Sequence, residues 1–136
     1  MIYKFEVPGK IHGKERPRLN RYSGAIYTPR TTKNYEELIK ENFLEKYPNF
    51  KIIEGRIKIK IIAYFSIPKS TRKRDINDML ENNISPVKRP DIDNIVKVIL
   101  DSLTKVAFKD DIQVTKLYVE KKYCKEDKLY IFIKQY

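Results

Sequence analysis

The residue types that could carry chemistry begin in a short segment, residues 89–97, which reads Arg-Pro-Asp-Ile-Asp-Asn-Ile-Val-Lys. Proline disfavours helical geometry at the residue before it, so the approach to this segment is predicted to be extended. Asp91 and Asp93 are two residues apart, and on an extended segment they point to the same side, with Ile92 turned into the core. We expect Asp93 to cap a helix that follows, which places Lys97 one turn inside that helix.

A further aspartate, Asp111, lies in residues 109–113 at the entrance to a predicted strand. If that strand lies beside the start of the helix, Asp111 joins Asp91 and Asp93. Three carboxylates in one place repel each other unless they bind a cation or take up protons. Oxygen ligands without histidine or cysteine suit Mg²⁺, with Mn²⁺ as a possible substitute. Such an ion can polarise a phosphate and lower the pKa of a bound water, and Lys97 could stabilise the developing charge.

The same residues also have an ordinary structural interpretation. Asp91 and Asp93 can be carboxylates that the dipole favours at a helix start. Lys97 and Asp101 can be a surface pair at i and i+4, and residues 110–111 can be an ordinary turn. Spacing alone therefore leaves both interpretations open.

The charge of the chain indicates the kind of partner. There are 29 lysines and arginines against 18 aspartates and glutamates, which gives a net charge of +11. Residues 1–33 hold eight basic residues against two glutamates. A positive field of this size favours a polyanion, such as nucleic acid or an anionic membrane surface. A generally basic surface without a partner is the alternative.

Several classes of protein are disfavoured by composition. No stretch approaches the roughly 20 apolar residues of a membrane helix, and the N-terminus lacks the apolar core of a secretory signal. Cys124 is the single cysteine, which excludes an internal disulfide framework and a multi-cysteine zinc site. His12 is the single histidine, so a histidine-based mechanism is disfavoured. We expect a cytoplasmic protein without an organic cofactor and without a membrane partner.

The length of 136 residues suits one domain, residues 1–136. Apolar periodicity and turn residues predict an α+β fold in which two main helices pack on a mixed β-sheet. The expected elements are a strand over 2–7, a loop with a short hairpin over 10–30, a helix over 32–47 capped by Thr31 or Thr32, a strand over 55–67, a charged connection over 69–89 with a short helix around 74–82, a helix over 94–105, and strands over 112–123 and 128–135. We also expect a bulge near 115–116 and a hairpin turn at 126–128.

Residues 89–103 followed by residues 108–113 resemble the RusA family of Holliday junction resolvases. The shared pattern is Pro-Asp-x-Asp-Asn with a lysine three residues on, followed by Asp-Asp-x-Gln. The resemblance is weaker at residues 13–18, 27–29 and 67–69. One departure is the pair at 104–105, Thr-Lys, where many relatives carry Asn-Gly.

This resemblance implies a homodimeric, Mg²⁺-dependent endonuclease of the kind that bacteria and their prophages encode. It implies a RusA-like fold and symmetric paired nicks in four-way DNA junctions, in DNA recombination and repair. Asp91, Asp93 and Asp111 match the metal-binding catalytic carboxylates, and Lys97 matches the catalytic lysine. Asp101 matches a recurrent aspartate that we expect to orient Lys97. Two further residues are assigned supporting roles, Asn94 and Asp110.

Basic residues near these motifs are the expected phosphate contacts: Lys14, Arg16, Arg18, Arg72, Lys73, Arg74, Lys88 and Arg89. For each one taken singly, a solvated surface role is an equal alternative. Tyr22, Tyr27 or Phe108 could wedge into the junction, although core packing is the commoner role of an aromatic side chain. Two rival functions remain: a non-catalytic, structure-specific DNA-binding protein, and a nuclease for other branched nucleic acids such as flaps, replication forks or RNA.

Overall fold

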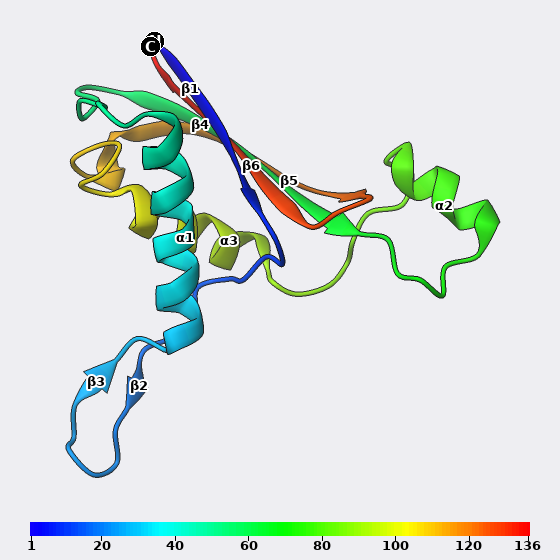
Figure 1. Cartoon of the computed structure of the whole chain (residues 1–136), viewed down its shortest axis with the longest axis horizontal. Helices are drawn as coiled ribbons and strands as arrows, with labels where there is room; N and C mark the ends of the chain where they lie inside the picture. Colours follow the sequence, from blue (N-terminus) through cyan, green and yellow to red (C-terminus); the bar gives the residue numbers. More distant parts are fainter.

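A computed structural model describes residues 1–136 and places a four-stranded mixed sheet at the centre of the fold (Figure 1). Its strands are β1 (Ile2–Pro8), β4 (Ile57–Ser66), β5 (Val114–Cys124) and β6 (Lys128–Gln135), in the order β1-β6-β4-β5. β6 is antiparallel to both its neighbours, while β5 is parallel to β4. The alternating side chains Ile57, Ile59, Ile61, Ala63 and Phe65 of β4 are all buried, which explains why this strand is internal.

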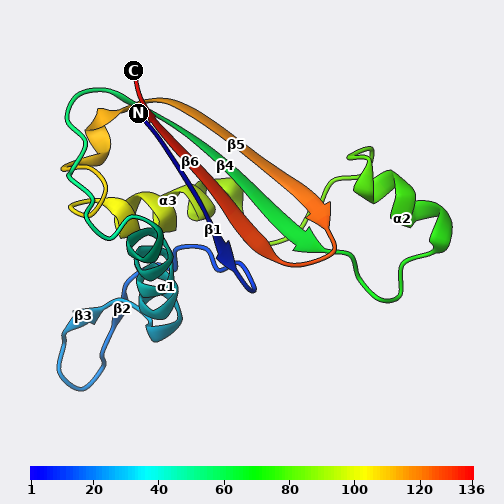
Figure 2. The ribbon, with the colours of Figure 1, turned by 45° about the horizontal axis from the view of Figure 1, so that its top comes forward.

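Two helices cover one face of the sheet, α1 (Arg30–Lys46) and α3 (Ile92–Leu103) (Figures 1 and 2). α1 buries Tyr35, Ile39 and Phe43, at helical spacing. α3 contributes Ile95, Val98, Ile99 and Leu103 to the same cluster of 21 buried residues. The predicted α+β fold with two main helices on a mixed sheet is therefore confirmed.

The predicted caps of both main helices are wrong. α1 begins at Arg30 with Pro29 at the N-cap position, so neither Thr31 nor Thr32 caps it. Thr32 is fully buried, and its hydroxyl accepts a hydrogen bond from the backbone N–H of Glu15 at 3.2 Å. The threonine therefore anchors an N-terminal loop to the helix.

α3 begins two residues earlier than predicted, because Asp91 occupies the N-cap position and Asp93 lies in the first turn. Ile92 is consequently on the solvent side of the helix and is 45% exposed, instead of turned into the core. The buried stripe of α3 starts at Ile95. A helix that begins at residue 92 can bury this apolar stripe and still leave the side chains of its first turn exposed to solvent.

The last two strands differ from the predicted hairpin. β5 and β6 are antiparallel and joined by a short turn, but β4 lies between them in the sheet. The strongly apolar β4 takes an internal position between β6 and β5, which the local sequence of the turn does not predict. The predicted bulge is confirmed, since Ile57 pairs with Val114 and Lys58 with Lys116, which leaves Thr115 unpaired.

Two segments project from this body (Figure 1). One is the predicted hairpin, β2 (Arg18–Leu19) with β3 (Ile26–Tyr27), and the other carries the predicted short helix, α2 (Lys73–Leu80). α2 has no buried residue. The side-chain amide of Asn82 beyond it donates to Glu120 of β5 at 3.1 Å. None of the helices has the length and apolar character needed to cross a membrane.

Truncation of the α3 core tests this packing. Ile99→Ala removes a fully buried side chain, so we expect a loss of about 2–5 kcal/mol in the free energy of unfolding, measured by urea denaturation. Ile26→Ala on the hairpin, where the side chain is 76% exposed, should cost less than about 0.5 kcal/mol. Equal losses in the two variants would contradict the packing described.

Candidate active site

A polar cleft of about 890 Å³ lies where the N-terminal loop meets the start of α3. Its lining contains no hydrophobic side chain. The lining residues are His12, Gly13, Lys14, Glu15, Arg16, Pro17, Arg18, Arg89, Pro90, Asp91, Asp93 and Asn94. The fold therefore brings together the Pro-Asp-x-Asp-Asn motif and the basic Gly-Lys-Glu-Arg-Pro-Arg segment, which are distant in the sequence.

The close approach of the two segments depends on Gly13. A Cβ atom at this position would lie 2.8 Å from the Cβ of Pro90 and 2.9 Å from the Cβ of Asn94. The next residue, Lys14, donates its backbone N–H to the carbonyl oxygen of Asn94 at 2.9 Å. Only glycine permits this approach, so the residue is required here for space.

Asp91 and Asp93 both line the cleft and are exposed. Neither takes part in any ion pair within 4.0 Å. Two neighbouring carboxylates without a direct ion-pair partner leave negative charge that a divalent cation could neutralise. Mg²⁺ is commonly held by one or two carboxylates together with water and substrate phosphate, so this donor set fits Mg²⁺.

Lys121 of β5 is a neighbour of this site that no local motif indicated. Burial lowers its pKa, the charge of Asp91 raises it and the charge of Lys88 lowers it, with a net decrease from the usual value. Its ammonium group donates to the backbone carbonyl of Lys88. Lys121 therefore supports the segment that leads into Asp91, and only the three-dimensional fold reveals it.

Lys97 lies one turn after Asp93 on α3, as predicted, and its side chain is 58% exposed. Its ammonium nitrogen lies 3.1 Å from Oδ1 of Asp101. The two residues expected to interact are therefore in contact. Asp101 is less exposed than Lys97, which suits a residue that fixes the position of another.

The Asp-Asp-x-Gln motif forms a short 3₁₀ helix, η1 (Asp111–Gln113), before β5. Asp110 caps it by accepting from the N–H of Ile112 at 3.0 Å, and the side-chain oxygen of Gln113 accepts from the N–H of Asp110 at 3.0 Å. The amide nitrogen of Gln113 also donates to the carbonyls of Ile53 and Gly55. Asp110 and Gln113 therefore shape the turn, which leaves the Asp111 carboxylate without a structural partner.

Before this turn, Lys105 has a φ of +69°. This is the left-handed region that favours glycine. The Asn-Gly pair of the family resemblance would suit this conformation, which a lysine adopts here.

Within one chain, Asp111 does not join Asp91 and Asp93, contrary to the expected arrangement. No group of three metal-ligating side chains is present in residues 1–136. η1 follows the far end of α3 and lies at the end of the sheet where both termini meet (Figure 2). Asp91 is near Lys121, which lies seven positions along β5 from Val114. At 3.3 Å per residue this is about 23 Å, far beyond the reach of one metal ion.

The predicted phosphate contacts fall into separate groups. Arg16, Arg18 and Arg89 line the cleft. Arg72, Lys73 and Arg74 are exposed at the start of α2, and Lys88 lies over the rings of Phe65 and Tyr123. Lys14 is turned toward two carboxylates, Glu36 and Asp101. DNA contact by any of these residues remains a prediction.

Burial distinguishes among the aromatic side chains that could wedge into a DNA junction. Phe108 is fully buried, so the proposed wedge at this position is wrong. Tyr22 is fully exposed and Tyr27 is 44% exposed, both in the projecting hairpin segment. His12 packs edge-on against Tyr35 with ring centroids 5.3 Å apart, which agrees with a structural role.

The fold and the cleft define a small α+β protein whose basic groove holds a pair of free carboxylates, and comparison with known proteins identifies the class. The family model described as endodeoxyribonuclease RusA matches residues 8–134. The chain therefore belongs to the RusA endodeoxyribonuclease family. It is also 29% identical, over 136 residues, to YqaN of Bacillus subtilis (strain 168), a protein described as uncharacterized. That match covers 97% of this chain and 95% of YqaN.

The need for glycine at position 13 can be tested directly. In Gly13→Ala the new methyl group meets two Cβ atoms that cannot rotate away, so the loop must move. We expect a loss of about 1–3 kcal/mol in stability and faster hydrogen exchange of the Lys14 amide, measured by NMR. Gly24→Ala introduces a Cβ that meets no atom within 4 Å, and any strain from its φ of +72° is confined to the hairpin, so this variant should leave the Lys14 amide unchanged. Unaltered Lys14 exchange in Gly13→Ala would contradict the close approach.

Proposed function

We propose that this protein is a Mg²⁺-dependent endodeoxyribonuclease that cuts four-way DNA junctions by paired nicks, and that it acts as a homodimer. The observation that supports this most strongly is the cleft in which Asp91 and Asp93, without a direct ion-pair partner, lie among arginines. A protein that only bound DNA would gain nothing from unpaired carboxylates at a surface that receives phosphates, because they repel the ligand. Family membership points to the same chemistry.

The candidate site residues have different proposed roles, which follow from the chemistry of their side chains. Arg16, Arg18 and Arg89 would bind phosphate groups, because guanidinium groups match phosphate geometry. Asp91 and Asp93 would hold Mg²⁺, which when bound supplies charge neutralisation and lowers the pKa of a coordinated water. Lys97, at the exposed edge of α3, would stabilise the negative charge that develops on the phosphate.

The position of Asp111 supports a site shared between two chains. Asp111 has no structural partner, yet lies about a strand length from Asp91 in its own chain. A two-fold symmetric dimer can bring Asp111 of one protomer to the Asp91 and Asp93 of the other, and it does so twice. Two equivalent sites suit a junction whose resolution needs two matched nicks.

The first experiment is a nicking assay on a synthetic mobile four-way junction, with Mg²⁺ or with EDTA. A linear duplex and a flap of matched sequence serve as the competing substrates. Paired, Mg²⁺-dependent nicks on opposing junction strands are the expected result. Preferential cutting of the flap would redirect the proposal to another branched substrate, and tight binding without nicking would favour the binding protein.

Asp93→Asn tests the assigned carboxylates. We expect single-turnover junction cleavage to fall about a hundredfold or more, because the amide is a poor Mg²⁺ ligand. Junction binding should persist or tighten, since a negative charge has left a cleft that receives a polyanion. Glu45→Gln removes an exposed carboxylate of α1 that lies outside the cleft and should cleave at the wild-type rate. Wild-type cleavage by Asp93→Asn would remove this residue from the site.

Mixing two inactive variants tests the shared site. If Asp111 acts in the partner's site, a heterodimer of Asp93→Asn and Asp111→Asn contains one doubly altered site and one intact site. We therefore expect nicking to reappear on mixing. When protomers exchange at random, roughly a quarter of all active sites are intact. The products should be single nicks without paired incision. Persistent inactivity of a verified heterodimer would place all catalytic groups in one chain.

A further inference from the structure

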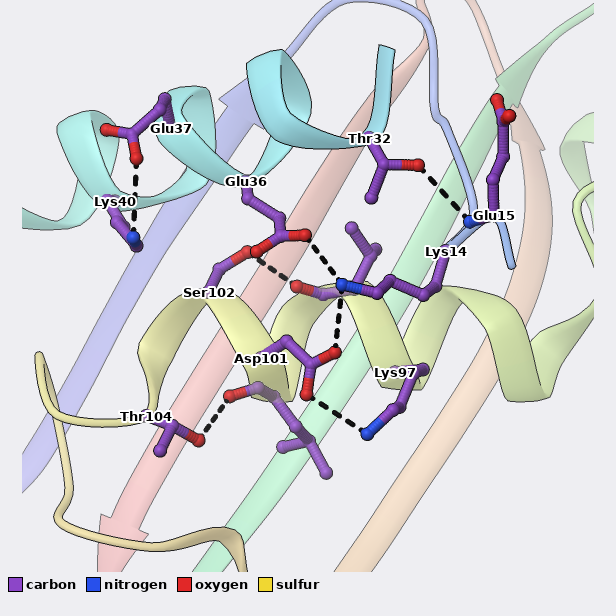
Figure 3. A network of polar contacts seen from close by, with 12 residues as sticks. Lys14, Glu15, Thr32, Glu36, Glu37, Lys40, Lys97, Asp101, Ser102 and Thr104 are labelled. Carbon is purple, nitrogen blue, oxygen red and sulfur yellow. Dashed lines mark hydrogen bonds and ion pairs between the residues drawn. The ribbon is translucent and has the colours of Figure 1, made fainter. Parts of the chain in front are cut away.

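Lys14 lines the cleft, and its ammonium group lies between two carboxylates (Figure 3). Its ammonium nitrogen is 2.8 Å from Oε1 of Glu36 on α1 and 3.2 Å from Oδ2 of Asp101 on α3. The other oxygen of Asp101, Oδ1, is 3.1 Å from the ammonium nitrogen of Lys97. Four alternating charges therefore connect α1, the N-terminal loop and the exposed face of α3. The sequence motifs had indicated only the last of these contacts.

Exposure changes along this chain of charges. The side chains of Glu36, Lys14 and Asp101 are 17%, 20% and 24% exposed, whereas that of Lys97 is 58% exposed. Three members are thus partly withdrawn from water, where each contact is stronger and each loss of a partner more costly. The fourth member is the catalytic candidate, and it alone projects into solvent.

Lys14 is cationic at any pH at which such an enzyme would work. Burial is the largest single effect and lowers its pKa, but the hydrogen bonds and charges of Glu36 and Asp101 together outweigh it and raise the pKa above 10.5. A lysine whose pKa is raised by folding contributes stability below its unfolded pKa and loses it as the pH rises through the folded value. Deprotonation of Lys14 therefore weakens these contacts only in strongly alkaline solution.

The backbone of this loop is held from two sides, so Lys14 cannot readily turn toward DNA. Its N–H is bonded to the carbonyl of Asn94 at 2.9 Å, and the N–H of Glu15 is bonded to the buried hydroxyl of Thr32 at 3.2 Å. If the Lys14 ammonium moved to a phosphate, Glu36 and Asp101 would be left partly buried without their cation. This cost opposes the phosphate contact that the sequence suggested.

We propose that Lys14 and Glu36 are positioning residues for Lys97. Lys14 neutralises and fixes Asp101, Glu36 fixes Lys14, and Asp101 then holds the Lys97 ammonium on the exposed face of α3. The inference rests on the proposed nuclease function for its catalytic consequence. The arrangement itself can be tested without catalysis.

The first test separates positioning from DNA contact by the salt dependence of junction binding. Each phosphate contact contributes about 0.9 to the slope of log K against log salt concentration. Lys14→Met should leave this slope unchanged. The control is Arg16→Met, two residues away on the same loop and exposed without an ion-pair partner, which should lower the slope by about 0.9. A slope for Lys14→Met that falls as in Arg16→Met would overturn the proposal.

The second test asks whether Lys14 acts through Lys97. In single-turnover cleavage at saturating junction, Lys14→Met should reduce the rate about 10- to 100-fold, as loss of a supporting contact around an active site does. Added to Lys97→Met, it should cause no further loss, because the group that it positions is gone. Glu36→Gln, a milder change that preserves the shape of the side chain, should show a smaller loss with the same non-additivity. Equal losses in both backgrounds would instead mark a role in general stability.

The outcome for Lys14 stays separate from the outcome for the nuclease. Wild-type nicking is measured first, and its absence would refute the proposed function alone. In either case, the NMR order parameter of the Lys97 Cε–H bonds reports positioning directly. It should fall in Lys14→Met and in Glu36→Gln when thermal unfolding confirms that the variants are folded. An unchanged order parameter in both folded variants would overturn the inference.

Discussion

The contact on which the site depends is the packing of the N-terminal loop against the first turn of α3. Gly13 allows the loop to approach Pro90 and Asn94 more closely than any side chain would permit. This approach places Arg16 and Arg18 opposite Asp91 and Asp93 in one cleft. It also places Lys14 within reach of both helices. The need for glycine at position 13 thus determines both the position of the arginines in the cleft and the position of Lys14 between the helices.

The site combines charges that are paired with charges that are left free. Glu36, Lys14, Asp101 and Lys97 neutralise each other in sequence and join three segments of the chain. Asp91, Asp93 and Asp111 have no such partners. Unpaired carboxylates beside one another, as Asp91 and Asp93 are, lower the stability of a fold, so their presence here agrees with a functional requirement. The 21-residue core beneath them supplies the stability that tolerates this.

Periodicity in the sequence was sufficient to predict most elements, because the alternation of β4 and the stripe of α3 reflect burial directly. The spacing of Asp91, Asp93 and Lys97 along the chain indicated that they lie within two helical turns, but not that Asp91 and not Asp93 is the N-cap. The position of Asp111 was not, because it depends on which end of α3 the strand β5 starts beside. Lys121 and Glu36 were missed for the same reason: their contacts join segments that no local pattern relates.

The helix α3 lies between the two groups of candidate catalytic residues, Asp91 with Asp93 at its start and Asp111 beyond its end. The helix is 12 residues long, about 18 Å, and residues 104–110 connect its end to η1. Each residue added to a helix turns everything beyond it by about 100°. An insertion in the first turn of α3 would therefore misdirect Asp111 and displace Ile95, Ile99 and Leu103 from the core together. The tip of the β2–β3 hairpin neither positions a candidate catalytic residue nor contributes to the core. Over evolutionary time, α3 should therefore keep its length while the hairpin freely gains and loses residues.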